Sequence, residues 1–317
     1  MMKQAVLSTK VGAALDRRHF LKTVTAAAGA CLLPISAQPR GAELAQRLHL
    51  GAQTNAWGVP IKDYNHLLEI AETLVRLGYG GFETNFASVR AQVGRAADCR
   101  RDFESRHIQF VAPHTGGLFY QKERVEKEID QVQRMAGSCA QMGASHVIVS
   151  GEKLPHPDGK LDLDAVHIKA DTLNRLGAAV KKDGVRLCYH NHETEFQDDP
   201  SEMSYLLRET DPNYVWLNLD VCHCYTWSDP VEFTAANFRR IAIFHLRDTT
   251  RKTAGDGDAT KPGEGKIDLK GIVAPLLGSD WDGWLEVEDA PNYPKPDANP
   301  ELVMQTWREY LRRLTGV

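Results

Sequence analysis

The chain has 317 residues, of which 42% are hydrophobic and 25% are charged, and its formal net charge is −4. A chain of this length and composition can bury a large core within a single domain. The mild negative charge and the lack of a long lysine or arginine run argue against nucleic acid or an anionic membrane as the main partner. A small solute is therefore the expected partner.

Residues 1–40 are predicted to be an export leader rather than part of the fold. The stretch "DRRHFLK" is followed by the apolar stretch "VTAAAGACLLPI", which resembles a bacterial twin-arginine signal with Arg17 and Arg18 as the pair. The apolar run is too short to span a bilayer comfortably, so we expect a removable signal and no stable membrane anchor. This predicts a periplasmic protein that uses the twin-arginine export machinery, a route that carries proteins already folded with their cofactor.

Eight β-rich runs alternate with amphipathic patterns over residues 45–317. The clearest helical patterns, with apolar residues every three or four positions, cover 125–142 and 303–314. No glycine-rich dinucleotide fingerprint follows the first run, which disfavours an open doubly wound sheet. The pattern predicts an α/β fold, a single (β/α)8 TIM barrel. The eight runs are 48–55, 79–86, 108–115, 145–152, 185–192, 215–223, 241–248 and 283–289.

Nearly every run turns polar at its carboxyl end. In a TIM barrel these ends meet at one face, which carries the active site. Gathering carboxylates and imidazoles in a partly desolvated mouth is costly unless a cation compensates. The pattern therefore predicts one divalent metal ion there. The polar residues at the strand ends are Asn55, Glu83, His114, Glu152, His190, Asp220, His245 and Glu288.

Five motifs stand out in the second half of the chain: "GVRLCYH", "LNLDVCH", "FHLRD", "WLEVE" and "KPGEGKID". With these motifs the chain resembles the xylose isomerase-like TIM barrel superfamily, over essentially the whole mature chain and most strongly from residue 184 onward. That superfamily holds sugar isomerases, ketose 3-epimerases, inosose dehydratases and endonuclease IV. In the ketose 3-epimerases, four side chains from strands five to eight hold the metal. The resemblance implies His190, Asp220, His245 and Glu288 as ligands here, for Mn, Zn, Co or Fe.

One position departs from the epimerases. They carry a glutamate where this chain has His190, and that glutamate is half of the pair that moves the proton between the two sugar faces. A neutral imidazole is a good ligand for these metals, but its presence argues against the two-glutamate mechanism. The runs "YHNH" and "FHLRD" are more similar to the inosose dehydratases and related sugar lyases.

The resemblance implies abstraction of a proton α to a carbonyl of a sugar, keto-sugar or cyclitol, through an enediolate that the metal stabilises. Epimerisation, isomerisation and β-elimination all remain open outcomes of that intermediate. An unphosphorylated or oxidised sugar is favoured for an exported enzyme. The candidate bases are Glu152, Glu288 and His192, and the candidate substrate-binding residues are Glu83, His114, His223 and Arg251.

Several alternatives stay open. Glu193 and Glu195 are either a solvated or helix-capping pair, or functional. An endonuclease IV-like phosphodiesterase is disfavoured because it requires three zinc ions and a basic face. A sugar-binding barrel without catalysis is not excluded by fold. Aromatic residues near the mouth either stack on a sugar ring or seal the interface of a homo-oligomer. These are Trp57, Phe86, Phe119, Tyr225 and Trp227.

Overall fold

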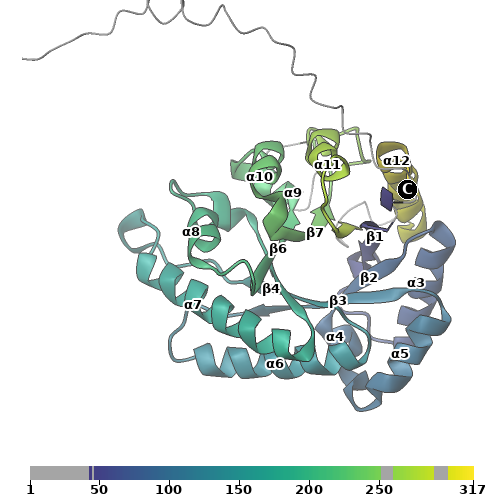
Figure 1. Cartoon of the computed structure of the whole chain (residues 1–317), viewed down its shortest axis with the longest axis horizontal. Coiled ribbons are helices and arrows are strands. Elements are labelled where there is room, and N and C mark those ends of the chain that lie inside the picture. Colours follow the sequence, from purple (N-terminus) through teal and green to yellow (C-terminus); the bar gives the residue numbers. More distant parts are fainter. Residues whose placement is uncertain (1–42, 45, 251–259, 289–298) are drawn as a thin grey trace, which may run out of the picture. The chain divides into compact units, whose positions relative to one another are not determined.

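The computed structural model describes residues 43–44, 46–250, 260–288 and 299–317, so the predicted leader and Arg251 lie outside the described residues. Eight parallel strands form a closed barrel in which each strand pairs with the next and the last pairs with the first (Figure 1). The predicted TIM barrel is thereby confirmed. The strands are β1 (Leu48–Gln53), β2 (Gly81–Asn85), β3 (Gln109–Gly117), β4 (His146–Gly151), β5 (Arg186–His190), β6 (Val215–Asp220), β7 (Ile241–Leu246) and β8 (Gly283–Val287).

Helices connect consecutive strands and surround the barrel (Figure 1). The apolar spacing over 125–142 forms one helix, α6, whose buried face includes Val132, Met135 and Cys139. The α-helices are α3 (Tyr64–Leu77), α4 (Phe86–Val89), α5 (Ala96–Ser105), α6 (Val125–Gln141), α7 (Leu163–Val180), α8 (Glu202–Glu209), α9 (Val221–Trp227), α10 (Pro230–Asn237), α11 (Leu269–Leu277) and α12 (Pro300–Thr315). Short 3-10 turns lie between them: η1 (Thr54–Trp57), η2 (Arg90–Arg95), η3 (Pro157–Gly159), η4 (Lys181–Asp183), η5 (Glu193–Phe196) and η6 (Phe238–Arg240).

Seven of the eight strands end earlier than the predicted runs, and the exception is β3, which continues to Gly117. Asp220 closes β6 and caps α9, since its Oδ1 accepts the backbone N–H of His223 at 2.8 Å. A carboxylate at this position satisfies a backbone donor that the first turn of the helix leaves free. The strand end therefore fixes both the carboxylate and the helix that carries His223.

Side chains alternate across each strand, which separates the barrel interior from the layer under the helices. On β5, Cys188 packs with Ile148 and Ile243 of other strands, whereas Leu187 and Tyr189 belong to the large core beneath the helices. His190 is two residues after Cys188 and so faces the interior. This alternation sends every second strand-end residue toward the mouth.

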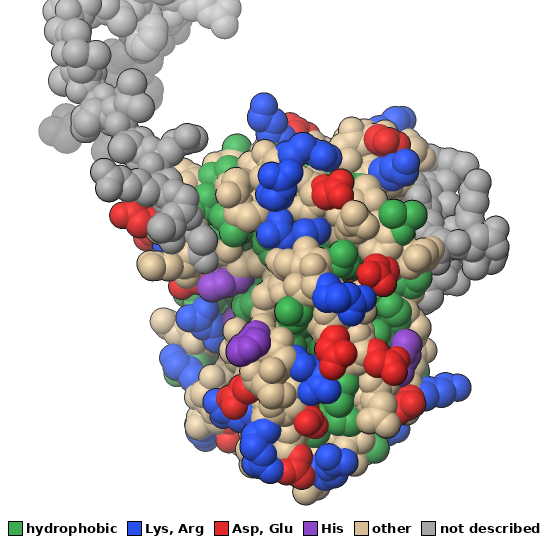
Figure 2. All heavy atoms as spheres, turned by 90° about the vertical axis from the view of Figure 1, so that its right-hand side faces the viewer, with side chains coloured by type: hydrophobic (Ala, Val, Ile, Leu, Met, Phe, Trp, Pro, Cys, Tyr) green, Lys and Arg blue, Asp and Glu red, His purple; other side chains and the backbone are tan. Residues whose placement is uncertain are grey.

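The surface in Figure 2 carries interspersed positive and negative side chains. No helix in the described part of the chain is long and apolar enough to cross a membrane.

Candidate metal centre

Four polar side chains from four consecutive strand ends converge in the barrel. Each of the four offers one ligand atom, and these atoms all lie within 4.8 Å of one another. All four residues are buried. The set combines two imidazoles with two carboxylates, which suits Zn, Mn, Co or Fe. Its members are His190 of β5, Asp220 of β6, His245 of β7 and Glu288 directly after β8.

Three of these residues each carry a buried polar atom without a hydrogen-bond partner: His190 Nδ1, His245 Nδ1 and Glu288 Oε2. The last two form an ion pair at 2.7 Å, outside hydrogen-bond geometry. A buried polar atom without a hydrogen bond costs about 1–3 kcal/mol, so the occurrence of such atoms within one cluster requires an explanation. A divalent cation among them would satisfy all three at once, so the residues present fit a metal.

The charge states of two donors also suit a metal. Burial, followed by the neighbouring His114 and His245, lowers the pKa of His190 well below its ordinary value, so its imidazole is neutral. Burial alone would raise the pKa of Glu288, but His245 and Arg247 hold that pKa well below its ordinary value. A neutral imidazole and an ionised carboxylate are the forms that bind metals.

Glu83, predicted to bind substrate, lies beneath this cluster. The carboxylate is completely buried, and its two oxygens lie 2.9 Å from His114 Nδ1 and 2.5 Å from His245 Nε2. Burial raises the pKa of Glu83, but these histidines outweigh burial and lower the pKa to about 2. Because Nε2 of His245 is paired with Glu83, the other ring nitrogen, Nδ1, faces the four-donor cluster. Glu83 therefore orients two histidine rings.

Glu286 is a buried carboxyl that the sequence analysis did not single out. Its Oε2 lies 3.8 Å from His245 Nε2, and neither oxygen has a hydrogen-bond partner. Burial and the nearby Glu83 raise its pKa to about 8, against the opposing effect of His245, so the group is protonated at neutral pH. An ideal Cβ at Gly51 would lie 2.7 Å from Glu286 Oε1, so glycine provides room for this side chain.

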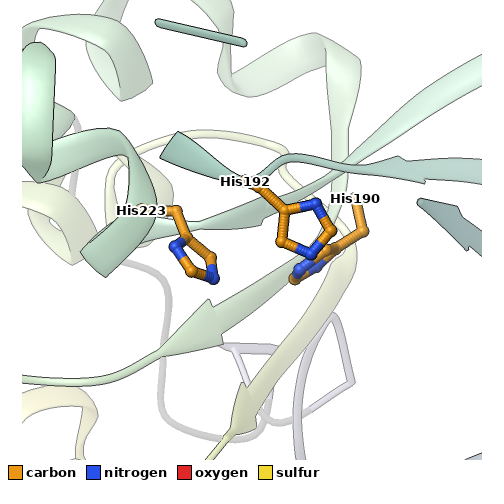
Figure 3. Close-up of side chains that lie close together, drawn as sticks. All are labelled: His190, His192 and His223. Atoms are coloured by element: carbon orange, nitrogen blue, oxygen red, sulfur yellow. The ribbon is translucent and has the colours of Figure 1, made fainter. Parts of the chain in front are cut away.

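His190 of the four-donor cluster lies close to two further histidines, His192 and His223 (Figure 3). The ring centroid of His192 lies 5.2 Å from that of His190 and 5.2 Å from that of His223. His223 Nδ1 lies 2.9 Å from Glu193 Oε2. Burial lowers the pKa of His223, but Asp220 and Glu193 raise it above the ordinary value on balance. Hydrogen bonding from His223 in turn lowers the pKa of Glu193 to about 2.

Arg247, inside the quoted run "FHLRD", is a second residue that sequence reasoning missed. Its Nε and Nη2 donate to Asp220 Oδ2 at 3.0 and 2.5 Å, and the side chain is buried. A guanidinium in this position is a permanent positive charge beside the proposed ligands. It balances part of the negative charge that the carboxylates bring into the barrel.

Asp248 organises the loop that follows β7. Its Oδ1 accepts the backbone N–H groups of Thr249 at 2.8 Å and Ile267 at 3.2 Å, and its Oδ2 accepts those of Gly263 at 2.8 Å and Gly265 at 3.0 Å. The "KPGEGKID" stretch is therefore anchored at the carboxyl end of β7, next to the mouth. The aspartate of the His-x-x-Asp pattern has a structural role.

Glu152, a predicted base, does not belong to the cluster. Glu152 is exposed on the segment after β4, and Arg251 is outside the described residues. Phe119 was expected to be available for a sugar or a subunit interface, but it is completely buried. Trp227, in contrast, is 57% exposed. The other aromatics near the mouth, Trp57, Phe86 and Tyr225, are partly buried.

The architecture and the sequence agree on a family. Residues 71–314 match the family described as "Xylose isomerase-like TIM barrel". The chain belongs to this family. Inosose dehydratase of Geobacillus kaustophilus is 29% identical to it over 234 residues, which cover 65% of this chain and 75% of the relative.

Solved structures with low identity share the fold. The IOLI protein with a bound zinc atom superposes with a TM-score of 0.69 at 19% identity, covering 84% of this chain and 98% of that one. D-psicose 3-epimerase superposes with a TM-score of 0.69 at 12% identity, covering 85% of this chain and 100% of the epimerase. Both structures therefore share the barrel fold of this chain.

Proposed function

We propose that the chain is a divalent-metal-dependent enzyme that removes a proton α to a carbonyl of a sugar, keto-sugar or cyclitol. The convergence of four buried ligand residues, three of which carry a buried polar atom without a hydrogen-bond partner, carries this proposal. His190, Asp220, His245 and Glu288 would hold the ion. The zinc in the IOLI structure supports a metal in this fold. A divalent ion bound there supplies Lewis acidity toward a carbonyl oxygen.

His192 is the best-placed candidate base. Its ring lies in the mouth between His190 and His223, and it is only partly buried, so a substrate can reach it. Glu288, the other candidate in the cluster, has one oxygen bonded to Asn55 at 3.2 Å and the second directed at the donor set. Glu152, which is exposed, has the weakest support of the three.

Loss of a β-substituent is the second candidate outcome, and two observations favour it. Inosose dehydratases are relatives of this chain, and the resemblance to the ketose 3-epimerases implies a glutamate where this chain has His190. His223, paired with Glu193, lies next to His192 and can donate a proton to a leaving hydroxyl. In this scheme His192 takes the α-proton, the carbon–oxygen bond at the β-position breaks, and water leaves with the proton of His223.

The location of the protein is also a proposal. The twin-arginine stretch supports export to the periplasm, where an unphosphorylated or oxidised sugar is the more accessible substrate. A leader at residues 1–40 and a barrel domain at 45–317 belong to the same proposal.

Exchange of the α-proton tests the function directly. Full-length protein loaded with Mn²⁺, Zn²⁺ or Co²⁺ is incubated in deuterated water with 2-keto-myo-inositol and a set of ketohexoses, and NMR follows C–H exchange and loss of water. We expect exchange in at least one probe, and its loss in His192→Gln with the metal retained. His156→Gln is the matched control, because His156 is a partly buried histidine that is bonded to Asp198 outside the cluster. Sugar binding without exchange would instead indicate a binding protein.

A further inference from the structure

Four buried polar side chains form a cluster behind the strand that carries the histidines. We call it the Lys169 cluster. Lys169 Nζ lies 2.5 Å from Glu202 Oε1 and 3.5 Å from Glu195 Oε1, and the hydroxyl of Tyr189 donates to Glu195 Oε1 at 2.5 Å. None of the four side chains is more than 2% exposed. The members come from α7, α8, β5 and η5.

The Lys169 cluster reaches the mouth through Glu195. The second oxygen of Glu195, Oε2, accepts the backbone N–H of His192 at 2.9 Å and the hydroxyl of Thr194 at 3.2 Å. Tyr189 faces the helices, whereas His190, the next residue, faces the barrel interior. One carboxylate thus joins the Lys169 cluster to the main chain that follows β5 and carries His192.

The two glutamates of η5 have opposite surroundings. Glu193 extends to His223 at the mouth, and Glu195 extends to Lys169 and Tyr189 in the interior. The sequence analysis left open whether these glutamates are capping or functional groups, and Glu195 is a buried capping group. Its carboxylate accepts the backbone N–H of His192, the residue that precedes η5.

Burying one ammonium and two carboxylates costs several kcal/mol, and hydrophobic residues could fill the same space. Burial, opposed by Lys169, raises the pKa of Glu202 to about 7, which shows how strongly this site is desolvated. A buried polar network whose members are all hydrogen-bonded favours one arrangement of the strands and turns that carry them. The Lys169 cluster joins β5, which ends before His192, to η5, which begins after it.

We infer that Glu195, held by Lys169 and Tyr189, is a positioning residue that sets the orientation of His192 in the barrel mouth. The consequence for turnover rests on the proposed function, but the positioning itself does not. The Lys169 cluster lies outside the barrel interior, so its effect on metal content should be small.

The ring signals of His192 provide a test that is independent of metal and substrate. Protein labelled with ¹⁵N-histidine is compared with Glu195→Gln, and His192 is assigned through His192→Gln. In Glu195→Gln, one oxygen still accepts from Tyr189, but the backbone N–H of His192 loses its carboxylate acceptor. We expect the His192 ring signals to shift or broaden, with unchanged signals from His49 and His146, which lie at the other end of their strands.

Glu128→Gln is the matched control, because Glu128 is also a buried glutamate, paired with Arg124 at 2.8 Å on α6. It should leave the His192 signals unchanged. Once a substrate is found, Glu195→Gln should lower kcat at least 10-fold with KM within about 3-fold, because the ring of His192 acts only in the chemical step.

Folded Glu195→Gln with wild-type His192 signals would overturn the inference. If that variant does not fold, Tyr189→Phe replaces it, since this change removes one hydrogen bond and retains the ring. We expect a smaller shift of the same His192 signals in Tyr189→Phe, and signals identical to the wild type would equally overturn the inference. Failure of the proposed function would appear separately, as missing exchange in a wild type whose His192 responds to Glu195→Gln.

Discussion

Asn191 and Asp220 exchange two hydrogen bonds. The amide of Asn191 donates to the backbone carbonyl of Asp220 at 3.1 Å, and the backbone N–H of Asp220 donates to Asn191 Oδ1 at 3.0 Å. Asn191 follows the end of β5, and Asp220 is the last residue of β6. The side chain of Asn191 therefore extends the hydrogen bonding between β5 and β6 past the last backbone pair. It holds Asp220 in place relative to His190.

Asn191→Ala should weaken both the fold and the metal site. Two buried backbone groups lose their partners, which costs about 2–4 kcal/mol of unfolding free energy. Since Asp220 is then no longer held next to His190, we also expect at least a 10-fold loss of metal affinity. Urea unfolding and titration with Co²⁺ measure the two effects.

Asn174→Ala is the control for that prediction. The side-chain amide of Asn174 likewise makes two bonds to backbone groups, donating to Glu209 O at 2.9 Å and accepting from Asp211 N at 2.6 Å. Its loss should destabilise the protein without changing Co²⁺ affinity. Equal losses of affinity in the two variants would show that the Asn191 effect is only a general loss of stability.

Glu83→Gln should lower metal affinity about 10- to 100-fold without removing a ligand, as expected for a residue that orients ligands through hydrogen bonds. The carboxylate is the ionised partner of His245 Nε2, and an amide would leave the His245 ring less firmly oriented. Isothermal titration with Zn²⁺ measures the change. Affinity equal to the wild type would refute the orienting role of Glu83.

Asp248→Ala should release the loop that follows β7. Four backbone N–H groups lose a shared carboxylate, so we expect faster hydrogen exchange in a peptide covering 260–267, by at least 10-fold. Peptides from β5 should exchange as in the wild type. A protected loop in Asp248→Ala would contradict this account.

His146 makes stability depend on pH. Burial, followed by Arg186 and His49, lowers its pKa from 6.5 to about 3 in the folded state. Below pH 6.5 the unfolded chain gains a proton that the folded chain does not, so stability falls as the pH falls toward 3. Between pH 8 and pH 5 the loss from this residue is about 2 kcal/mol. In His146→Gln the unfolding free energy should therefore fall less between pH 8 and pH 5, by that amount. An identical pH dependence of unfolding free energy in both proteins would contradict the lowered pKa of His146.

The four-donor cluster could be predicted because parallel strands in a barrel end at one edge. His190, Asp220 and His245 each occupy the polar end of an apolar run, and the closed barrel brings those ends together. Strand order predicts only that the polar strand ends lie together, whereas the choice of these residues as metal ligands came from the resemblance to the ketose 3-epimerases. Their neutral or ionised state, in contrast, depends on burial and on neighbours that the order of strands does not reveal.

The depth of each polar side chain below the barrel mouth could not be predicted, because it depends on the residue at which the strand ends. β2 continues for two residues past Glu83, so this carboxylate lies one layer below the mouth. β4 ends at Gly151, and it is Ser150, 3.4 Å from His114 Nε2, that faces inward. Glu152 then lies outside the barrel. Glu286 was missed because only the last polar residue of each run was considered, although the alternation in "WLEVE" sends both glutamates to the same side.

Elemental analysis of purified full-length protein, beside His190→Ala and the control His156→Ala, tests the central claim most directly. The account predicts about one Mn, Zn, Co or Fe ion per chain in the wild type and in His156→Ala, and none in His190→Ala. No ion in the wild type after reconstitution, or an ion retained by His190→Ala, would contradict the proposed metal centre.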